Sequence, residues 1–131
     1  MRLGFFLGAK GRREAVEDAA VIHIIRTRAT TQQMEEMLQV LETYVKLAVD
    51  LERGVLAGGG VLHADCEAAL LEDGSRQENV WGADWIPGAQ QVTYESLINI
   101  RPRQNNPSLE ILDSGIRERV VEIVKPLLGG V

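Results

Sequence analysis

The chain has 131 residues, a length that fits one domain with its own core. Hydrophobic residues make up 45% and charged residues 25% of it, as is ordinary for a globular protein in water. The net charge of −5 argues against general nucleic-acid binding, and the single cysteine excludes an internal disulfide and a multi-thiolate zinc site.

Residues 1–19 indicate an N-terminal extension, and residues 20–131 a single domain. The apolar start of the extension is followed by basic residues, where a signal peptide would place a small-residue cleavage site. No apolar run approaches the roughly 20 residues that span a bilayer. We therefore expect a cytoplasmic protein without a membrane partner.

The first predicted elements are a strand over residues 20–26 and a helix after it. The strand is apolar on both faces, which is typical of a central strand. Thr30 and Gln33 have the spacing of a capping box and begin the helix. The apolar stripe of this helix consists of Met34, Met37, Leu38, Leu41 and Tyr44.

A β-hairpin follows. Residues 45–51 alternate apolar and polar, which predicts a strand with one buried face. Residues 52–54 supply a turn, and residues 55–57 return as the partner strand. The glycines at 58–60 end it. They suit either a backbone nest for an anion or an ordinary loop that needs positive φ, and we favour the loop because no nucleotide-binding motif surrounds them.

Residues 64–73 fit either a helix or a hairpin that turns at Asp73 and Gly74. The run is rich in helix formers, Asp65 can cap it, and Gly74 occupies the C′ position. The hairpin would set two leucines against Gln77 and Arg76, a poor cross-strand match. We therefore predict a helix.

Two further strands are predicted over residues 80–86 and 92–101. The first carries Trp81 and Trp85 on one face, where they suit either the core or a dimer patch, and we favour the core. The second alternates regularly, with Asn99 and Arg101 near its end. Residues 102–108 are polar and predict a loop.

A final helix completes the domain. Asp113 can cap it, and Pro126 should end or bend it near Lys125. Its apolar stripe consists of Ile116, Val120, Ile123, Val124 and Leu127. The predicted order is β-α-β-β-α-β-β-α, which indicates an α+β domain. We expect a mainly antiparallel sheet of about five strands with helices packed on one face.

His63, Asp65 and Glu67 are the first candidates for catalysis. On a helix, His63 and Glu67 are four residues apart and can chelate one metal ion or form an acid–base pair, with a third ligand from elsewhere. On a strand they would be roughly 13 Å apart, too far for one ion. A structural interpretation, which we favour, has Asp65 as a cap, His63 bonded to the loop and Glu67 at the helix dipole.

Two other chemically distinctive residues fit structural roles better than functional ones. Cys66 is better explained as a small buried apolar residue than as a nucleophile. His23 lies in the apolar strand, where we expect a core residue with a satisfied hydrogen bond.

Asn99, Arg101 and Arg103 are the candidates for ligand binding. Two arginines beside an amide can hold a carboxylate or a phosphate, which predicts a small anionic ligand. The alternative, which we favour, is a solvated strand end with local ion pairs.

Several separate blocks of the chain carry a family resemblance, namely residues 49–54, 62–65 with Glu67, 70–75, 81–82 and 96–102. In these blocks the chain resembles, from about residue 20 to the C-terminus, a small prokaryotic domain family of unknown function. The resemblance implies a single domain and carries no activity or site residue.

The sequence contains no complete catalytic motif and identifies no cofactor, so whether the chain is an enzyme stays open. We predict a domain that binds a ligand or a partner without catalytic activity of its own, as a homo-oligomer. One alternative is a metal-assisted hydrolase or phosphate-handling enzyme that uses His63, Asp65 and Glu67. Another is regulatory nucleic-acid binding through Arg101 and Arg103, which the acidic balance disfavours.

Overall fold

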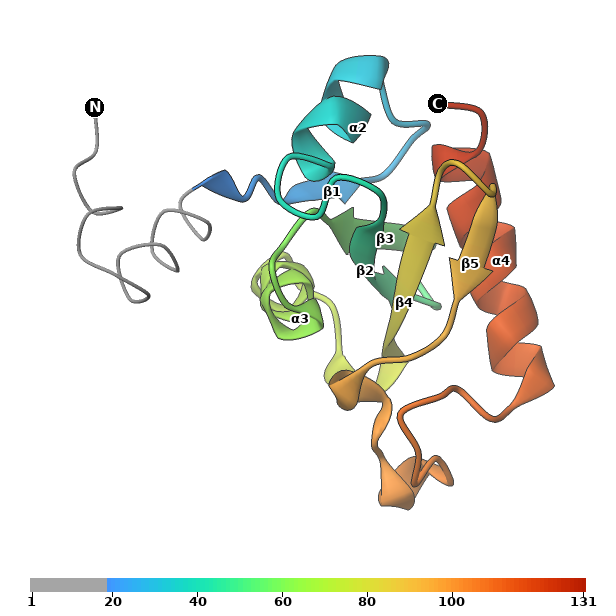
Figure 1. Cartoon of the computed structure of the whole chain (residues 1–131). Coiled ribbons are helices and arrows are strands. Elements are labelled where there is room, and N and C mark those ends of the chain that lie inside the picture. The colour runs from blue at the N-terminus through green and yellow to red at the C-terminus, as the bar shows by residue number, and fades with distance from the viewer. Residues whose placement is uncertain (1–18) are drawn as a thin grey trace, which may run out of the picture.

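The computed structural model describes residues 19–131, so the predicted extension lies almost entirely outside the described residues. A five-stranded antiparallel sheet forms the centre, in the order β1-β3-β2-β4-β5 (Figure 1). Its strands are β1 (His23–Ile25), β2 (Val45–Asp50), β3 (Val55–Gly58), β4 (Val80–Ile86) and β5 (Gln91–Thr93). The helices are α2 (Thr31–Met37), α3 (His63–Glu72) and α4 (Ser114–Leu128). The predicted α+β class and the order of elements are confirmed.

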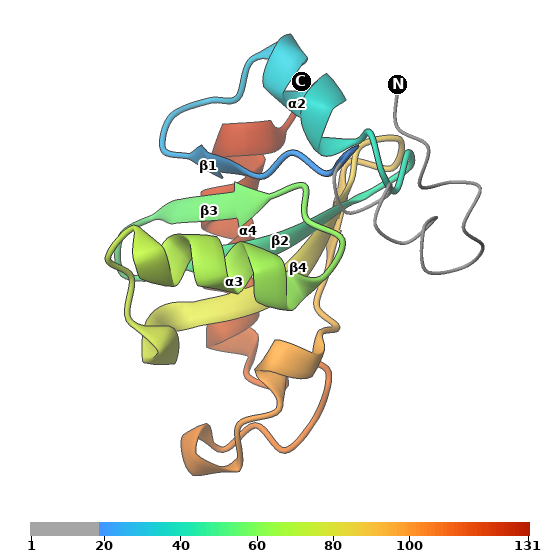
Figure 2. The same cartoon turned by 90° about the vertical axis from the view of Figure 1, so that its left-hand side faces the viewer.

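Helices cover both faces of the sheet, not one face as predicted. Figure 2 shows α3 in front of the sheet and α4 behind it. Side chains alternate across β2, so Leu47 and Val49 join α2 and α4 in one apolar cluster, while Ala48 joins α3 in another. The prediction is wrong because Ala48 alternates with the large apolar residues of β2 and so matches the solvent-facing side, whereas it is buried against α3.

β1 is an edge strand of three residues, so its predicted central position is wrong. It pairs with β3 alone. Its faces are both apolar because Ile25 packs into the α4-side cluster while Ile22 and Ile24 pack into the α3-side cluster. The two-layer covering of the sheet therefore gives an edge strand the pattern of a central one.

The capping box of α2 is confirmed, but the helix ends earlier than its apolar stripe predicts. The Gln33 amide N–H donates to Thr30 Oγ1 at 3.0 Å, and the Thr30 N–H donates to Gln33 Oε1 at 2.9 Å. After Met37 the chain must reverse to enter β2 at the fully buried Val45, and Glu42 adopts φ of +67° in that reversal. The turn replaces the last part of the predicted helix.

The hairpin of β2 and β3 is confirmed, and its closing glycines have a steric role. Gly59 has φ of +105°, and a Cβ there would lie 2.1 Å from the Val21 carbonyl oxygen. A side chain at this position would force the backbone apart. The loop interpretation of the glycine run is therefore confirmed.

The helix predicted over residues 64–73 is confirmed as α3, and the start of α4 is also as predicted. The Ile116 N–H donates to Asp113 Oδ1 at 3.0 Å, which caps α4. α4 continues through Pro126 to Leu128, so of the two predicted effects of Pro126 the end of the helix near Lys125 is wrong, and the bend stays a prediction. Pro126 lies on the exposed side, where the carbonyl that loses its partner can be hydrated, and the buried Leu128 keeps the last turn packed.

The strand β4 has the predicted bounds, and Trp81 and Trp85 are both buried in the core. The strand predicted over residues 92–101 is wrong beyond Thr93, where β5 ends. Residues 94–113 instead form a long loop with two short 3₁₀ helices, η3 (Leu97–Asn99) and η4 (Pro102–Gln104). We call these residues the 94–113 segment.

None of the helices in residues 19–131 is long and apolar enough to cross a membrane. The side chains predicted to have functional roles lie on α3, on β1 and in the 94–113 segment.

Candidate functional site

The site begins where β5 leaves the sheet. Beyond Thr93 the outer edge of β4 has no strand beside it, and the Asn99 side chain takes over the pairing. Asn99 Oδ1 accepts from the Gly82 N–H at 2.8 Å, and Asn99 Nδ2 donates to the Gly82 carbonyl at 3.0 Å. A Cβ on Gly82 would lie 2.4 Å from Ser96 Cβ, so only glycine allows this close approach. Asn99 is fully buried and therefore has no surface to offer a ligand.

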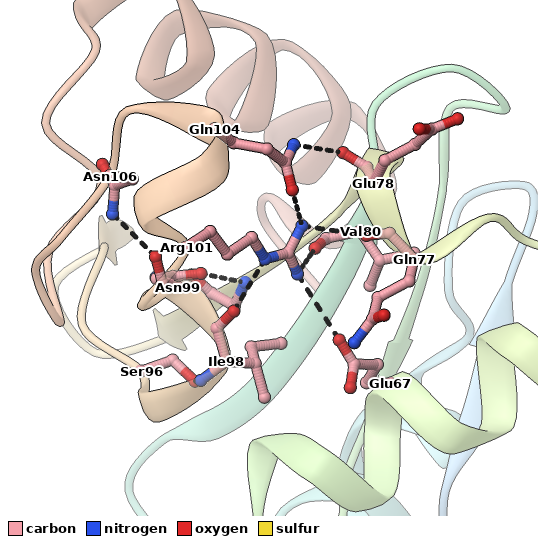
Figure 3. Close-up of polar contacts among 11 residues, drawn as sticks. Glu67, Gln77, Glu78, Val80, Ser96, Ile98, Asn99, Arg101, Gln104 and Asn106 are labelled. Carbon is pink, nitrogen blue, oxygen red and sulfur yellow. Dashed lines mark hydrogen bonds and ion pairs between the residues drawn. The ribbon is translucent and has the colours of Figure 1, made fainter.

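Arg101 also bonds to the backbone at this edge of β4. Its Nη2 donates to the Val80 carbonyl, and its Nη1 donates to the Gln77 carbonyl at 2.8 Å. Its Nε donates to the Ile98 carbonyl at 2.9 Å. Figure 3 shows the guanidinium enclosed by these partners between α3 and the 94–113 segment.

Two side chains complete the shell around the guanidinium. Arg101 Nη2 lies 3.4 Å from Glu67 Oε2, and Nη1 lies 3.4 Å from Gln104 Oε1. With the three carbonyls this makes five hydrogen bonds, as many as the guanidinium has N–H groups. The guanidinium also stacks over the Trp81 ring at 4.7 Å. Arg101 therefore has no donor left for an anion.

Glu67 and Arg101 form a largely buried ion pair, with side chains 13% and 10% exposed. Burial raises the pKa of the Glu67 carboxyl, against the opposing effects of the Arg101 charge and a hydrogen bond from Gln77. Burial also lowers the pKa of Arg101, and Glu67 opposes that shift. On both residues burial affects the pKa more than the partner's charge does. The guanidinium is also fixed by its hydrogen bonds to the three carbonyls.

A second buried asparagine fixes the 94–113 segment from inside. Asn106 Nδ2 donates to the carbonyls of Asn99 and Glu110 at 2.8 and 2.9 Å, and its Oδ1 accepts from the Leu112 N–H at 2.9 Å. Loop backbone that would otherwise lack partners is thereby satisfied. The segment is consequently a pre-formed wall on one side of the Arg101 site.

Glu67 and Arg101 line an open cleft with a volume of about 850 Å³. Its wall from the 94–113 segment carries Leu97 and Ile100, which are 77% and 47% exposed. The remaining lining residues are Arg76, Gln77, Glu78, Ile98, Pro102, Arg103 and Gln104. This volume falls within the range of roughly 300–1,000 Å³ that is usual for ligand sites. The cleft thus combines an aliphatic wall with charged groups.

The charges at the cleft are unequally paired. Glu67 contacts Arg101, and Glu78 lies 2.7 Å from Arg76. Arg103 is exposed, and it forms no ion pair with any of residues 19–131. Of the two arginines that are candidates for ligand binding, Arg101 is bonded to the backbone of the protein and Arg103 faces the solvent.

The structure does not bring His63, Asp65 and Glu67 together. His63 Nε2 lies 2.9 Å from Asp84 Oδ1 and 3.1 Å from the Ala83 carbonyl, away from the cleft. Asp65 Oδ2 accepts from the Leu62 N–H at 3.1 Å, so it caps α3 from inside the first turn. Within residues 19–131, no three His, Cys, Asp or Glu side chains are grouped so that they can hold a metal ion.

The remaining candidates have structural partners. Cys66 is buried and donates to the Lys46 carbonyl at 3.4 Å, and burial raises its pKa to about 11. The thiolate that a nucleophile needs is therefore scarce. His23 Nε2 lies 3.0 Å from Glu36 Oε1, so its hydrogen bond is satisfied, although the ring is partly exposed at the sheet edge and not in the core.

The aliphatic wall was not predicted. A strand over residues 92–101 would place Leu97 and Ile100 on opposite faces, whereas the 3₁₀ turn of η3 brings both to the cleft. In the run from Ser96 to Arg101 the polar Ser96 and Asn99 are buried while the apolar Leu97 and Ile100 are exposed. The mixture of apolar and polar residues in this run was the only signal of the wall in the sequence.

A family model described as "Protein of unknown function (DUF5674)" matches residues 23–127. No curated protein and no solved structure matches the chain.

Proposed function

The chain belongs to the DUF5674 family, whose function is unknown, and we propose that it is a binding domain that receives its ligand in the cleft beside the 94–113 segment. The observation that carries this proposal is the aliphatic wall: Leu97 is 77% exposed beside the cleft. Solvent-exposed aliphatic side chains that line a cleft are characteristic of surfaces that contact a ligand or partner.

The distribution of the exposed aliphatic side chains supports the same proposal. Four of the six large exposed ones in residues 19–131 lie in the 94–113 segment, and the other two are Leu62 and Leu71. The four are Leu97, Ile100, Leu109 and Leu112. Two buried asparagines hold this segment in shape, so less conformational entropy is lost when a ligand binds.

The polar groups at the cleft support binding without catalysis. A general base needs a free position beside a reacting group, but Glu67 is paired with Arg101, and His63 points to Asp84. The exposed Arg103 is the group best placed to meet an anionic ligand. The cytoplasmic location and the homo-oligomeric state stay predictions, which cell fractionation and light scattering test.

The proposal is tested with a fragment library and ligand-observed NMR on the full chain. The test variant is Leu97→Asp, and the matched control is Leu71→Asp, which adds the same charge to an exposed leucine of α3 outside the cleft. We expect fragments that bind the wild type and the control but lose at least tenfold in affinity for Leu97→Asp. The proposal fails if no fragment binds, or if fragments bind Leu97→Asp as well as the wild type. Equal thermal unfolding midpoints of the two variants verify that both are folded.

A further inference from the structure

The charge balance of the cleft indicates what its occupant must carry. Glu67 and Glu78 are each paired with an arginine of the cleft, which leaves the Arg103 charge uncompensated by residues 19–131. This local excess of positive charge contrasts with the chain's net charge of −5. An anionic group on the occupant would complement it, and such complementarity improves both specificity and association rate.

The exposure of the wall indicates the size of the occupant. Sites for small molecules enclose about 70–90% of the ligand surface. Leu97 and Ile100 form an open wall, which covers one side of an occupant and leaves its other side to the solvent. Leu109 and Leu112 add exposed aliphatic surface elsewhere on the same segment. An extended peptide that lies across the surface can contact more of these aliphatic side chains than a compact small molecule can.

From these two observations we propose that the occupant is a short peptide segment of a partner protein, with aliphatic side chains on the Leu97 and Ile100 wall and a carboxylate opposite Arg103. The inference rests on the proposed function, because it assumes that the cleft is a binding site. The other occupant, a small amphipathic anion, is an outcome of the test below.

The test uses a phage-displayed library of random linear dodecapeptides, selected on the full chain and depleted on the Leu97→Asp variant. We expect the selected peptides to share aliphatic residues next to Asp or Glu. Synthetic versions are then measured by calorimetry against wild type, Arg103→Glu and the control Arg28→Glu. Arg28 is also exposed, lies outside the cleft and gives the same change in net charge.

We expect Arg103→Glu to weaken binding by about tenfold, while Arg28→Glu leaves it within twofold. Exchange of the peptide's acidic residue for Lys should restore the affinity for Arg103→Glu. Peptides without an acidic residue that bind the cleft equally well would overturn the proposal, as would equal affinity for Arg103→Glu and wild type.

The outcomes separate this inference from the proposed function. If no peptide depends on Leu97 but fragments still bind in the cleft, the peptide inference is wrong, the occupant is a small molecule, and the binding function stands. If neither peptides nor fragments depend on Leu97, both proposals are wrong.

Discussion

The side-chain amide of Asn99 pairs with both backbone groups of Gly82, at 2.8 Å to the N–H and 3.0 Å to the carbonyl. A side chain thus stands in for the strand that would otherwise continue β5. Arg101 extends this substitution to the carbonyl of Val80. The edge of β4 is thereby closed, and the 94–113 segment is free to turn outward and form the cleft wall.

Replacement of Asn99 by Leu should destabilise the protein by roughly 2–4 kcal/mol, because it leaves buried groups of Gly82 without partners. Urea unfolding measures the change. The control is Asn79→Ala, which removes one exposed hydrogen bond to Glu52 and should cost less than about 1 kcal/mol. Equal losses for the two variants would contradict the structural role of Asn99.

Arg101→Met should lower the free energy of unfolding by about 3 kcal/mol or more, because Glu67 and three carbonyls lose their donor. Arg101→Lys should recover little of this loss, since an ammonium group cannot reproduce the planar fork. Arg103→Met is the control and should change stability by less than about 0.5 kcal/mol. Full recovery by Lys would show that charge alone matters at this position.

Asp73 should make the stability depend on acid pH. It accepts from Arg26 and Arg53 at 2.6 Å each, and these hydrogen bonds lower its pKa from 3.8 to about 2. A lowered pKa means that the stabilisation is complete above the unfolded value and is lost as the pH falls from about 4 to about 2.

The measurement for Asp73 is urea unfolding of wild type and Asp73→Asn at several values between pH 2 and pH 7. The wild type should be the more stable protein at pH 7, and the difference should shrink across the acid range. A difference that is the same at all pH values would exclude the carboxylate charge as its cause.

Cys66 should resist thiol reagents in the native state, because it is buried and has a pKa of about 11. Labelling with a chromogenic disulfide reagent at pH 8 should be negligible without denaturant and complete in guanidinium chloride. Rapid labelling of the folded protein would contradict its assignment as a buried apolar residue.

Much of the fold follows from local patterns in the sequence. The capping residues Thr30 and Asp113, the hairpin of β2 and β3, and the bounds of β4 each depend on signals within a few residues. Positions within the sheet were harder to predict. β1 is an edge strand because it pairs with β3 alone, while its apolar pattern reflects the packing on both of its faces. A single sequence displays neither the pairing nor the packing.

The candidate site shows the same limit more sharply. The alternation of residues 92–101 matches a strand, yet β5 ends at Thr93. Further along, the side chains of Asn99 and Arg101 take the place of a strand beside β4, because they bond to its backbone. Propensity does not indicate such pairing. The sequence offered Arg103 as a candidate for ligand binding, and this role stays a prediction. The aliphatic wall of Leu97 and Ile100 could not be predicted, because it depends on the 3₁₀ turn of η3.

The most direct test of the cleft is a map of backbone amide chemical shifts during titration of the ¹⁵N-labelled chain with a selected peptide or fragment. We predict that the perturbed amides belong to the cleft-lining residues that carry an N–H, which are Glu67, residues 76–78, Leu97, Ile98, Ile100, Arg101, Arg103 and Gln104. A second hollow of about 370 Å³ lies between Tyr94 and Arg117, a residue of α4, and its amides serve as the comparison for those of the cleft. Perturbations centred there, with the amides of the cleft-lining residues unchanged, would contradict the assignment of the cleft as the binding site.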